Sequence, residues 1–290
     1  MPPLSQGAPC EEPDEILECV VNVSEGRDAT VLNDLRASSA TCLLDVHSDG
    51  GHNRSVFTMA GSSGEVEEAT KALTIAALAR IDVSAHSGAH PRFGAVDVVP
   101  WVPLEGRPLH DAAPHLALQS RDRFASWAAA ELGLPVFLYG PERSLPDIRR
   151  NAWRSLPPDL GPPRPHPTGG SVAVGLRPLM VAYNLWMAKP DLAEAQAIAA
   201  GLRSPMVRTM SFSLAGQVQV SCNLLSPLTI GPAEIYDLVA ERAPIGRAEL
   251  VGLVPAAVLG AVPRERWESL DLSVSRTIEA KLDGWPARPR

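Results

Sequence analysis

The sequence predicts a mixed α/β (α+β) fold made of two ferredoxin-like units, each with the element order β-α-β-β-α-β. Three observations lead to this prediction. Runs rich in β-branched residues alternate with segments of helical spacing, in the same order in both halves of the chain. A proline-dense stretch over residues 141–168 separates the halves. A chain of 290 residues with 45% hydrophobic residues is long enough for two buried cores, and two such units can hold a ligand between their sheets.

The first unit is predicted over residues 16–168, after a disordered tail over residues 1–15. Its elements follow from apolar alternation, helical spacing, and Asp or Ser residues placed as helix caps. In order, they are a strand at Ile16–Val23, a helix from Asp28 to Ala37, strands at Cys42–His47 and Ser55–Ala60, a helix from Ser63, a strand at Val96–Val102, a helix over 111–132 and a strand at Pro135–Tyr139. The prolines of residues 141–168 predict an irregular connector at the end of this unit.

The second unit is predicted over residues 169–262 and repeats the same order without obvious sequence identity. Its elements are a strand at Leu179–Leu185, an Asp-capped helix at Asp191–Leu202, strands at Val207–Ser213 and Val218–Leu224, a helix at Pro232–Ala243 and a strand at Leu250–Val254. Residues 263–290 are predicted to form a C-terminal helix, Pro263–Leu282, and a tail.

The composition limits the classes of function. A net charge of −7 gives no indication of a nucleic-acid-binding surface. The N-terminus lacks the basic and apolar regions of a secretory signal, and no apolar run reaches the roughly 18 residues of a membrane span. The four cysteines show no zinc-ligand spacing. We therefore expect a cytoplasmic protein with reduced thiols that binds small molecules, and neither a membrane nor nucleic acid.

The stretch Ala85–Asp97 places two histidines, an arginine and an aspartate on a backbone rich in Gly and Pro. Loops held by a rigid scaffold concentrate catalytic residues, and a histidine there can accept and donate protons near neutral pH. The spacing of His86 and His90 suits zinc only on a helix, which Ser87-Gly88 and Pro91 oppose. We predict acid/base catalysis and no metal; the alternative is a pair of histidines that cap backbone groups.

A second polar cluster lies at Asp45, His47 and Asp49. On a strand these three residues share one face, opposite their apolar neighbours. Ionisable groups on one face of a central strand are costly unless they are paired or face a wet cleft. We predict that they form the floor of a cleft, where the carboxylates orient a histidine or hold an amine-bearing substrate; the alternative is a solvated sheet face.

These motifs belong to a longer collinear pattern over about residues 17–260. It comprises Glu18-Cys19-Val20-Val21-Asn22-Val23-Ser24-Glu25-Gly26-Arg27, Asp45-Val46, Asn53-Arg54, the loop from His86 to Asp97, Pro135-Val136 to Gly140, Gly170 to Arg177, Gln219 to Leu224, and Leu250 to Pro255. The pattern resembles that of the formiminotransferase family, which includes glutamate formimidoyltransferase and the N-terminal half of formiminotransferase-cyclodeaminase.

The resemblance implies two α/β subdomains whose sheets face each other across a folate-binding tunnel, in a homodimer. It implies transfer of a formimino group from N-formimino-L-glutamate to N5 of the co-substrate tetrahydrofolate, a step of histidine metabolism, with His90 as general acid/base. Guanidinium groups suit substrate carboxylates. The residues expected to bind substrate or folate are Asp45, His47, Arg54, His86, Arg92, Asp97, Gly170, Ser171, Val172, Ala173, Val174, Gly175 and Arg177.

The chain departs from the family pattern at several points. We expect no cyclodeaminase domain, and the second unit has a shortened basic stretch at Ser204–Met210. His47 and Asp49 replace the residues that follow Asp45-Val46 in animal members, and Trp186 stands where a second asparagine is usual. Three alternatives stay open: a folate-dependent transferase with another formyl or formimino donor, a non-catalytic folate-binding paralogue, and a metal-dependent hydrolase. The hydrolase would use His47, Asp49, His52 and His86.

Overall fold

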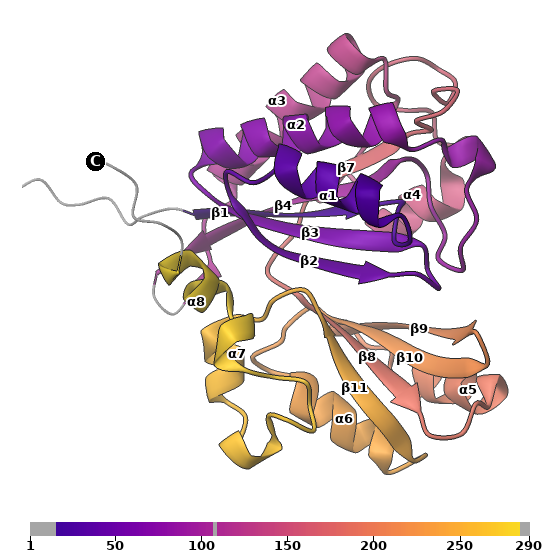
Figure 1. The fold of residues 1–290 in the computed structure, drawn as a ribbon, viewed down its shortest axis with the longest axis vertical. Helices are drawn as coiled ribbons and strands as arrows, with labels where there is room; N and C mark the ends of the chain where they lie inside the picture. The colour runs from indigo at the N-terminus through magenta and orange to yellow at the C-terminus, as the bar shows by residue number, and fades with distance from the viewer. Residues whose placement is uncertain (1–15, 107–108, 285–290) are drawn as a thin grey trace, which may run out of the picture.

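The computed structural model describes residues 16–106 and 109–284 as a mixed α/β structure of four layers (Figure 1). Two β-sheets face each other in the middle, and helices cover the outer face of each sheet (Figure 1). The mixed α/β class is therefore confirmed, whereas the ferredoxin-like classification of the two units stays a prediction. The predicted tail over residues 1–15 lies outside the described residues.

The first sheet is mixed and contains, among the described residues, seven strands in the order β2-β3-β1-β4-β7-β6, with β5 paired to β4. The strands are β1 (Ile16–Val23), β2 (Leu43–Asp49), β3 (Arg54–Gly61), β4 (Val96–Glu105), β5 (His110–Asp111), β6 (Val136–Tyr139) and β7 (Val172–Leu176). Helices α1 (Ala29–Ser38), α2 (Ser63–Arg80) and α3 (His115–Leu132) cover its outer face, and a short 3₁₀ turn, η1 (Val83–Ala85), follows α2 (Figure 1). The sheet is antiparallel except that β7 runs parallel to both β4 and β6.

Strand β1 shows how the sequence divides the two faces of this sheet. Its residues Leu17, Cys19 and Val21 are fully buried in the core beneath the helices. The alternate residues Glu18 and Asn22 face the other sheet, because successive side chains of a strand point to opposite sides. One face therefore builds the core, and the other supplies polar groups to the space between the sheets.

The second sheet is antiparallel, with the order β11-β8-β10-β9. Its strands are β8 (Val181–Met187), β9 (Val207–Leu214), β10 (Gln217–Leu224) and β11 (Ile245–Val251), and α5 (Leu192–Leu202) and α6 (Pro232–Ala240) cover its outer face (Figure 1). Strands β9 and β10 join through Ala215-Gly216, which both have positive φ as a tight hairpin requires. Strand β11 begins at Ile245 rather than at the predicted Leu250, because its first residues lie on an exposed edge and lack apolar alternation.

The segment between the units differs from the prediction in two ways. Helix α4 (Leu145–Asn151) interrupts the proline-rich connector, since Ser144 caps it and Pro146 lies in its first turn, where no N–H is needed. Strand β7 pairs with β4 and β6 in the first sheet, although the predicted boundary at residue 168 assigns it to the second unit. The first sheet thus continues to Leu176, with its last strand buried between two neighbours.

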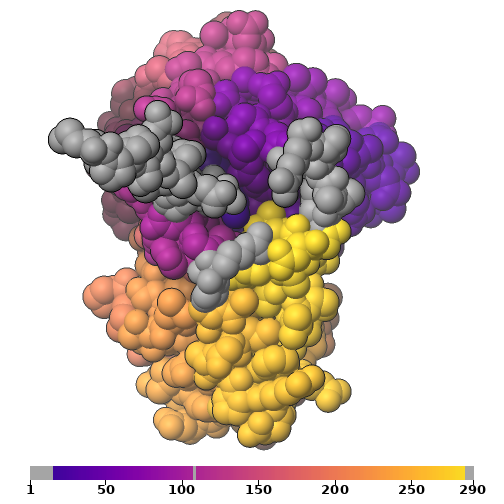
Figure 2. Space-filling view, turned by 90° about the vertical axis from the view of Figure 1, so that its left-hand side faces the viewer, coloured from indigo at the N-terminus to yellow at the C-terminus, as the bar shows by residue number. Residues whose placement is uncertain are grey.

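The single C-terminal helix predicted at Pro263–Leu282 is wrong. After α7 (Ala256–Gly260), the chain forms two 3₁₀ turns, η2 (Arg264–Arg266) and η3 (Val274–Arg276), and a short helix, α8 (Ile278–Asp283). Asp271 has positive φ and accepts a bond from the backbone N–H of Leu250, so tertiary contacts overrule helical spacing here. Ile278 packs in a cluster with Leu44 of β2, and Figure 2 shows this yellow segment lying against the violet first unit.

Among the helices of residues 16–106 and 109–284, none combines the length and the hydropathy that a membrane span requires.

Candidate active site

A cavity of about 480 Å³ lies between the two sheets. Alternate residues of the facing strands line it, because each strand presents every second side chain to the space between the layers. The polar and aromatic part of the lining includes Glu18 and Asn22 of β1, Arg54 and Thr58 of β3, Asn184 of β8 and Phe212 of β9. Both units therefore contribute to one site.

The histidine loop is held at one end of this cavity by close contacts between backbones. A Cβ atom at Gly88 would lie 2.3 Å from the carbonyl oxygen of His52, and one at Gly94 would lie 2.2 Å from that of Ser171. Gly170 has φ of +69° and bridges to Gly94. Only glycine permits such approaches, so these residues fix the loop against the β2–β3 turn and the start of β7.

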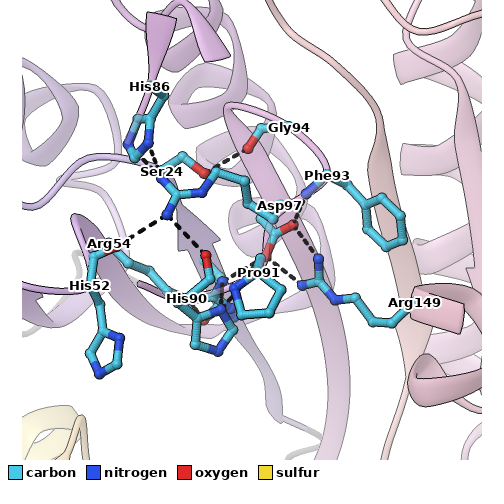
Figure 3. A network of polar contacts seen from close by, with 12 residues as sticks. Ser24, His52, Arg54, His86, His90, Pro91, Phe93, Gly94, Asp97 and Arg149 are labelled. Carbon is cyan, nitrogen blue, oxygen red and sulfur yellow. Dashed lines mark hydrogen bonds and ion pairs between the residues drawn. The ribbon is translucent and has the colours of Figure 1, made fainter. Parts of the chain in front are cut away.

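A buried carboxylate organises the site (Figure 3). Asp97 is fully buried and accepts bonds from Arg54 at 2.6 Å, from Arg149 at 2.9 and 2.5 Å, and from the backbone N–H of Phe93 at 2.6 Å. Burial alone would raise the pKa of Asp97, but the two guanidinium groups and the hydrogen bonds outweigh it and lower the pKa to about 2. Asp97 is therefore ionised, and it holds Arg54 in one orientation.

His90 lies beside Arg54 and lines the cavity (Figure 3). Its Nδ1 is 2.7 Å from the carbonyl oxygen of Pro91 and 3.1 Å from Nη1 of Arg54. We place the proton on Nδ1, because an unprotonated Nδ1 would set its lone pair against the carbonyl oxygen at 2.7 Å. Burial, followed by the charge of Arg54, lowers the pKa of His90 to about 3. The ring is thus neutral, and the lone pair on Nε2 is free to act as a base.

Aromatic and amide groups surround this imidazole. Phe212 of the second sheet stacks on His90 with ring centroids 5.8 Å apart, and His52 meets Phe212 edge to face at 4.8 Å. His52 Nε2 lies 2.7 Å from the side-chain amide of Gln219, and burial lowers the pKa of His52. Buried atoms of His52 and Gln219 have no hydrogen-bond partner in the described structure. These contacts position His90 between the two sheets.

The polar cluster predicted on β2 is only partly in the cavity. His47 and Asp49 line it, and His47 Nε2 lies 3.6 Å from a carboxylate oxygen of Glu249 on β11. Asp45 does not belong to the lining. A register shift between Leu43 and Asp45 interrupts the alternation, so Leu44 faces the other unit while Val46 packs beneath the helices.

Two further residues of the predicted loop support it from outside the cavity. Arg92 contacts the His86 ring and donates to the backbone carbonyl of His90 at 2.9 Å. Neither Arg92 nor His86 lines the cavity. The structure therefore places these two residues against the loop backbone, where they brace His90.

The glycine-rich stretch predicted to bind folate forms the start and body of β7. Its residues Gly170, Ser171, Val172, Ala173, Val174 and Gly175 do not line the cavity, whereas the next two residues, Leu176 and Arg177, do. Ser171 to Val174 are buried, and a Cβ atom at Gly175 would lie 2.2 Å from the ring of Tyr139. This stretch supports the cavity wall, and only its C-terminal end reaches the cavity.

Several polar residues of the site were not singled out from the sequence. Arg149 lies in the connector, where the prolines indicated no regular structure. Glu18 and Asn22 lie on β1, and their alternation with Leu17, Cys19 and Val21 was the signal that could have revealed them. Glu249 and Gln219 come from the second sheet, which only the tertiary fold brings to His47 of β2 and to His52 of the β2–β3 turn.

The described residues contain no group of three or more His, Cys, Asp or Glu side chains that could hold a metal ion. The four residues of the hydrolase alternative are separated: His47, Asp49 and His52 line the cavity, and His86 lies outside it. Within residues 16–106 and 109–284, the site therefore offers acid/base groups and cations.

Comparisons with known proteins identify the family of this chain. A family model for the N-terminal subdomain of the formiminotransferase domain matches residues 16–177. The chain is 32% identical to the glutamate formimidoyltransferase of Thermoplasma acidophilum, over 92% of this chain and 97% of that protein. It is 37% identical to the glutamate formimidoyltransferase of Streptococcus pyogenes, over 59% of this chain and 62% of that one. The formimidoyltransferase-cyclodeaminase of Sus scrofa is 32% identical over 84% of this chain, which spans 51% of the pig protein. The chain therefore belongs to the formiminotransferase family of transferases.

Proposed function

We propose that this protein transfers the formimino group of N-formimino-L-glutamate to N5 of tetrahydrofolate, with His90 as the general acid/base. One observation carries the proposal besides family membership. His90 is a neutral imidazole in the cavity wall, whose Nδ1–H donates to the carbonyl of Pro91 and which lies beside an arginine that a buried carboxylate fixes. Asp97 thus fixes the cation that lies next to the imidazole.

The proposed proton transfers use this geometry. N5 of the folate attacks the formimino carbon and forms a tetrahedral intermediate with a positively charged nitrogen. His90 Nε2 takes the proton from that nitrogen and then gives it to the nitrogen of the departing glutamate. The bond between carbon and the glutamate nitrogen breaks, and 5-formiminotetrahydrofolate and glutamate leave. One proton moves within the site, so no net acid or base is consumed.

A bound substrate adjusts the basicity of His90. Arg54 is one of the groups that lower its pKa. The donor carboxylates, held in the same cavity, offset part of that positive charge and raise the pKa of His90 toward the range in which one group serves as both base and acid. Holding both substrates in one cavity contributes a further part of the rate.

Arginines at the cavity are available for the substrate carboxylates. Arg177 and Arg208 line it, and neither forms an ion pair within residues 16–106 and 109–284. The guanidinium fork matches carboxylate geometry. Arg54 is already engaged by Asp97 and Asn22, so we assign the carboxylates of donor and folate chiefly to Arg177 and Arg208. The homodimer and the cytoplasmic location stay predictions.

The test is an anaerobic assay of the purified protein with N-formimino-L-glutamate and tetrahydrofolate, in which released glutamate and formimino-folate are both measured. We expect equal amounts of the two products. Folate binding without turnover would overturn the donor assignment, and N-formyl-L-glutamate and other formimino amino acids would be assayed next. Absence of folate binding by calorimetry would overturn the proposed function itself.

A further inference from the structure

Glu18 is a buried carboxyl group in the cavity wall that none of the proposed steps uses. Its side chain lines the cavity and the residue is 4% exposed. Within the part of the chain that the structure describes, its carboxyl group forms no hydrogen bond or ion pair, and its nearest charges act only through space. A buried carboxyl without a partner is costly, so its position in a cavity wall indicates that a ligand supplies the partner.

The position of Glu18 along the cavity restricts what that ligand can be. Glu18, Val20 and Asn22 follow one another on the same face of β1. Asn22 accepts bonds from Arg54, which in turn contacts His90. Asn22 lies four positions along the strand from Glu18, which corresponds to about 13 Å. That length accommodates a bicyclic ring with a polar contact at each end.

The wall between these two ends suits a flat ring. Val20 lies between Glu18 and Asn22 on β1, Val56 and Val98 flank Asn22 on the neighbouring strands, and Leu176 also lines the cavity. Aromatic and heteroaromatic rings bury well against such aliphatic side chains, while their polar edges need directed hydrogen bonds. The cavity thus combines an apolar middle with a base at one end and a carboxyl group at the other.

We propose that Glu18 recognises the pyrimidine edge of the reduced pterin, accepting one hydrogen bond from the ring N3–H and one from the exocyclic 2-amino group. This inference rests on the proposed function. The two N–H groups of the pterin edge are parallel, as in a guanidinium group, and a carboxylate accepts both. N5 lies on the opposite ring, so this contact turns N5 toward His90. Glu18 is therefore a positioning and specificity residue for the folate.

The ionisation of Glu18 provides a second test of this contact. Burial raises the pKa of Glu18 to about 7, Arg177 opposes this shift, and Asp111 and Glu279 add to it. An empty cavity therefore holds a mixture of protonated and ionised Glu18 at neutral pH. Because the pterin edge presents two donors, its binding selects the ionised form and releases about half a proton per ligand at pH 7.

The experiment measures tetrahydrofolate binding by anaerobic calorimetry at pH 7, in two buffers of different ionisation enthalpy. It compares the wild type, Glu18→Gln and the matched control Glu105→Gln, which removes a partly exposed carboxyl group from the same sheet. The second ligand is an analogue whose 2-amino group is replaced by methyl. We expect Glu18→Gln to weaken tetrahydrofolate binding about ten- to hundredfold, the scale of charge-assisted hydrogen bonds, and the control to change it less than about twofold.

The analogue separates recognition from a structural effect. The wild type should lose at least about tenfold in affinity when the amino group is absent, whereas Glu18→Gln should lose less than about threefold, because the partner is already gone. In steady-state assays Glu18→Gln should raise KM for tetrahydrofolate and leave KM for the donor unchanged. If Glu18→Gln does not fold, the analogue and the proton release still test the wild type.

The outcomes distinguish this inference from the function on which it rests. Tetrahydrofolate turnover together with equal affinity of the wild type for the analogue would refute the role of Glu18 and leave the transfer reaction intact. Absence of tetrahydrofolate binding to the wild type would refute both. The contact would be established if removal of the 2-amino group weakens binding to the wild type and has little further effect on binding to Glu18→Gln.

Discussion

Replacing Asp97 with asparagine should cost more stability than any other single charge removal at this site. Asp97 is fully buried and bonded to Arg54, Arg149 and the backbone of Phe93. An amide of the same size leaves two guanidinium groups facing a neutral side chain, and loss of one partner from a buried ion pair costs about 3–5 kcal/mol. Fluorescence-monitored unfolding in urea at pH 7 measures this difference.

The pH dependence provides an independent estimate of the same interaction. The pKa of Asp97 is about 2 in the folded protein, against 3.8 for an unperturbed Asp. A lowered folded pKa stabilises the fold above pH 3.8, and the contribution of about 2–3 kcal/mol is lost as the pH falls toward 2. The stability difference between wild type and Asp97→Asn should therefore be constant above about pH 5 and should shrink below pH 4.

An exposed carboxylate serves as the control. Asp122 pairs with Arg121, but its side chain is 54% exposed, so Asp122→Asn should change the unfolding free energy by less than about 1 kcal/mol. A loss of less than about 1 kcal/mol for Asp97→Asn would contradict the buried network described above. A loss that grew on acidification would contradict the sign of the pKa shift.

Three further changes test other parts of the structure. Gly175→Ala should destabilise the fold by about 1–3 kcal/mol in urea unfolding, because its Cβ would meet the Tyr139 ring, whereas Gly64→Ala, with open space around it, should be neutral or stabilising. Arg177→Ala should weaken folate binding by about 1.5–3 kcal/mol in calorimetry, and unaltered binding would remove it from the site. The raised pKa of Glu18 makes folding of the wild type less favourable as the pH rises from 4.5 through 7, and Glu18→Gln removes this loss. The free energy of unfolding of Glu18→Gln minus that of the wild type should therefore be about 2–3 kcal/mol larger at pH 8 than at pH 4 in thermal and urea unfolding. A difference that does not change with pH would refute this.

Local sequence signals predicted most of the secondary structure. Asp28 and Asp191 cap α1 and α5 as expected, because their carboxylates accept the first backbone N–H groups. The prediction failed where tertiary contacts dominate. The C-terminal segment has helical spacing, but Asp271 and Arg276 bond to β11 and hold the chain in turns.

The site was predictable only in part. The histidine loop stood out because its glycines and polar residues form one continuous stretch, and the structure brings His90, Arg54 and Asp97 together. The register shift in β2 turns Asp45 away from the cavity, and no local sequence pattern predicts such a shift. Phe212 reaches His90 from the facing sheet, a contact that depends on how the two units pack.

The most direct test of the role of His90 is a single-turnover measurement of formimino transfer, with tetrahydrofolate binding measured on the same preparations. We expect His90→Ala to lower the transfer rate by at least about a hundredfold, the lower range for general acid/base catalysis, while folate affinity stays within about tenfold. An unchanged transfer rate in His90→Ala would contradict the role that the geometry of this site supports.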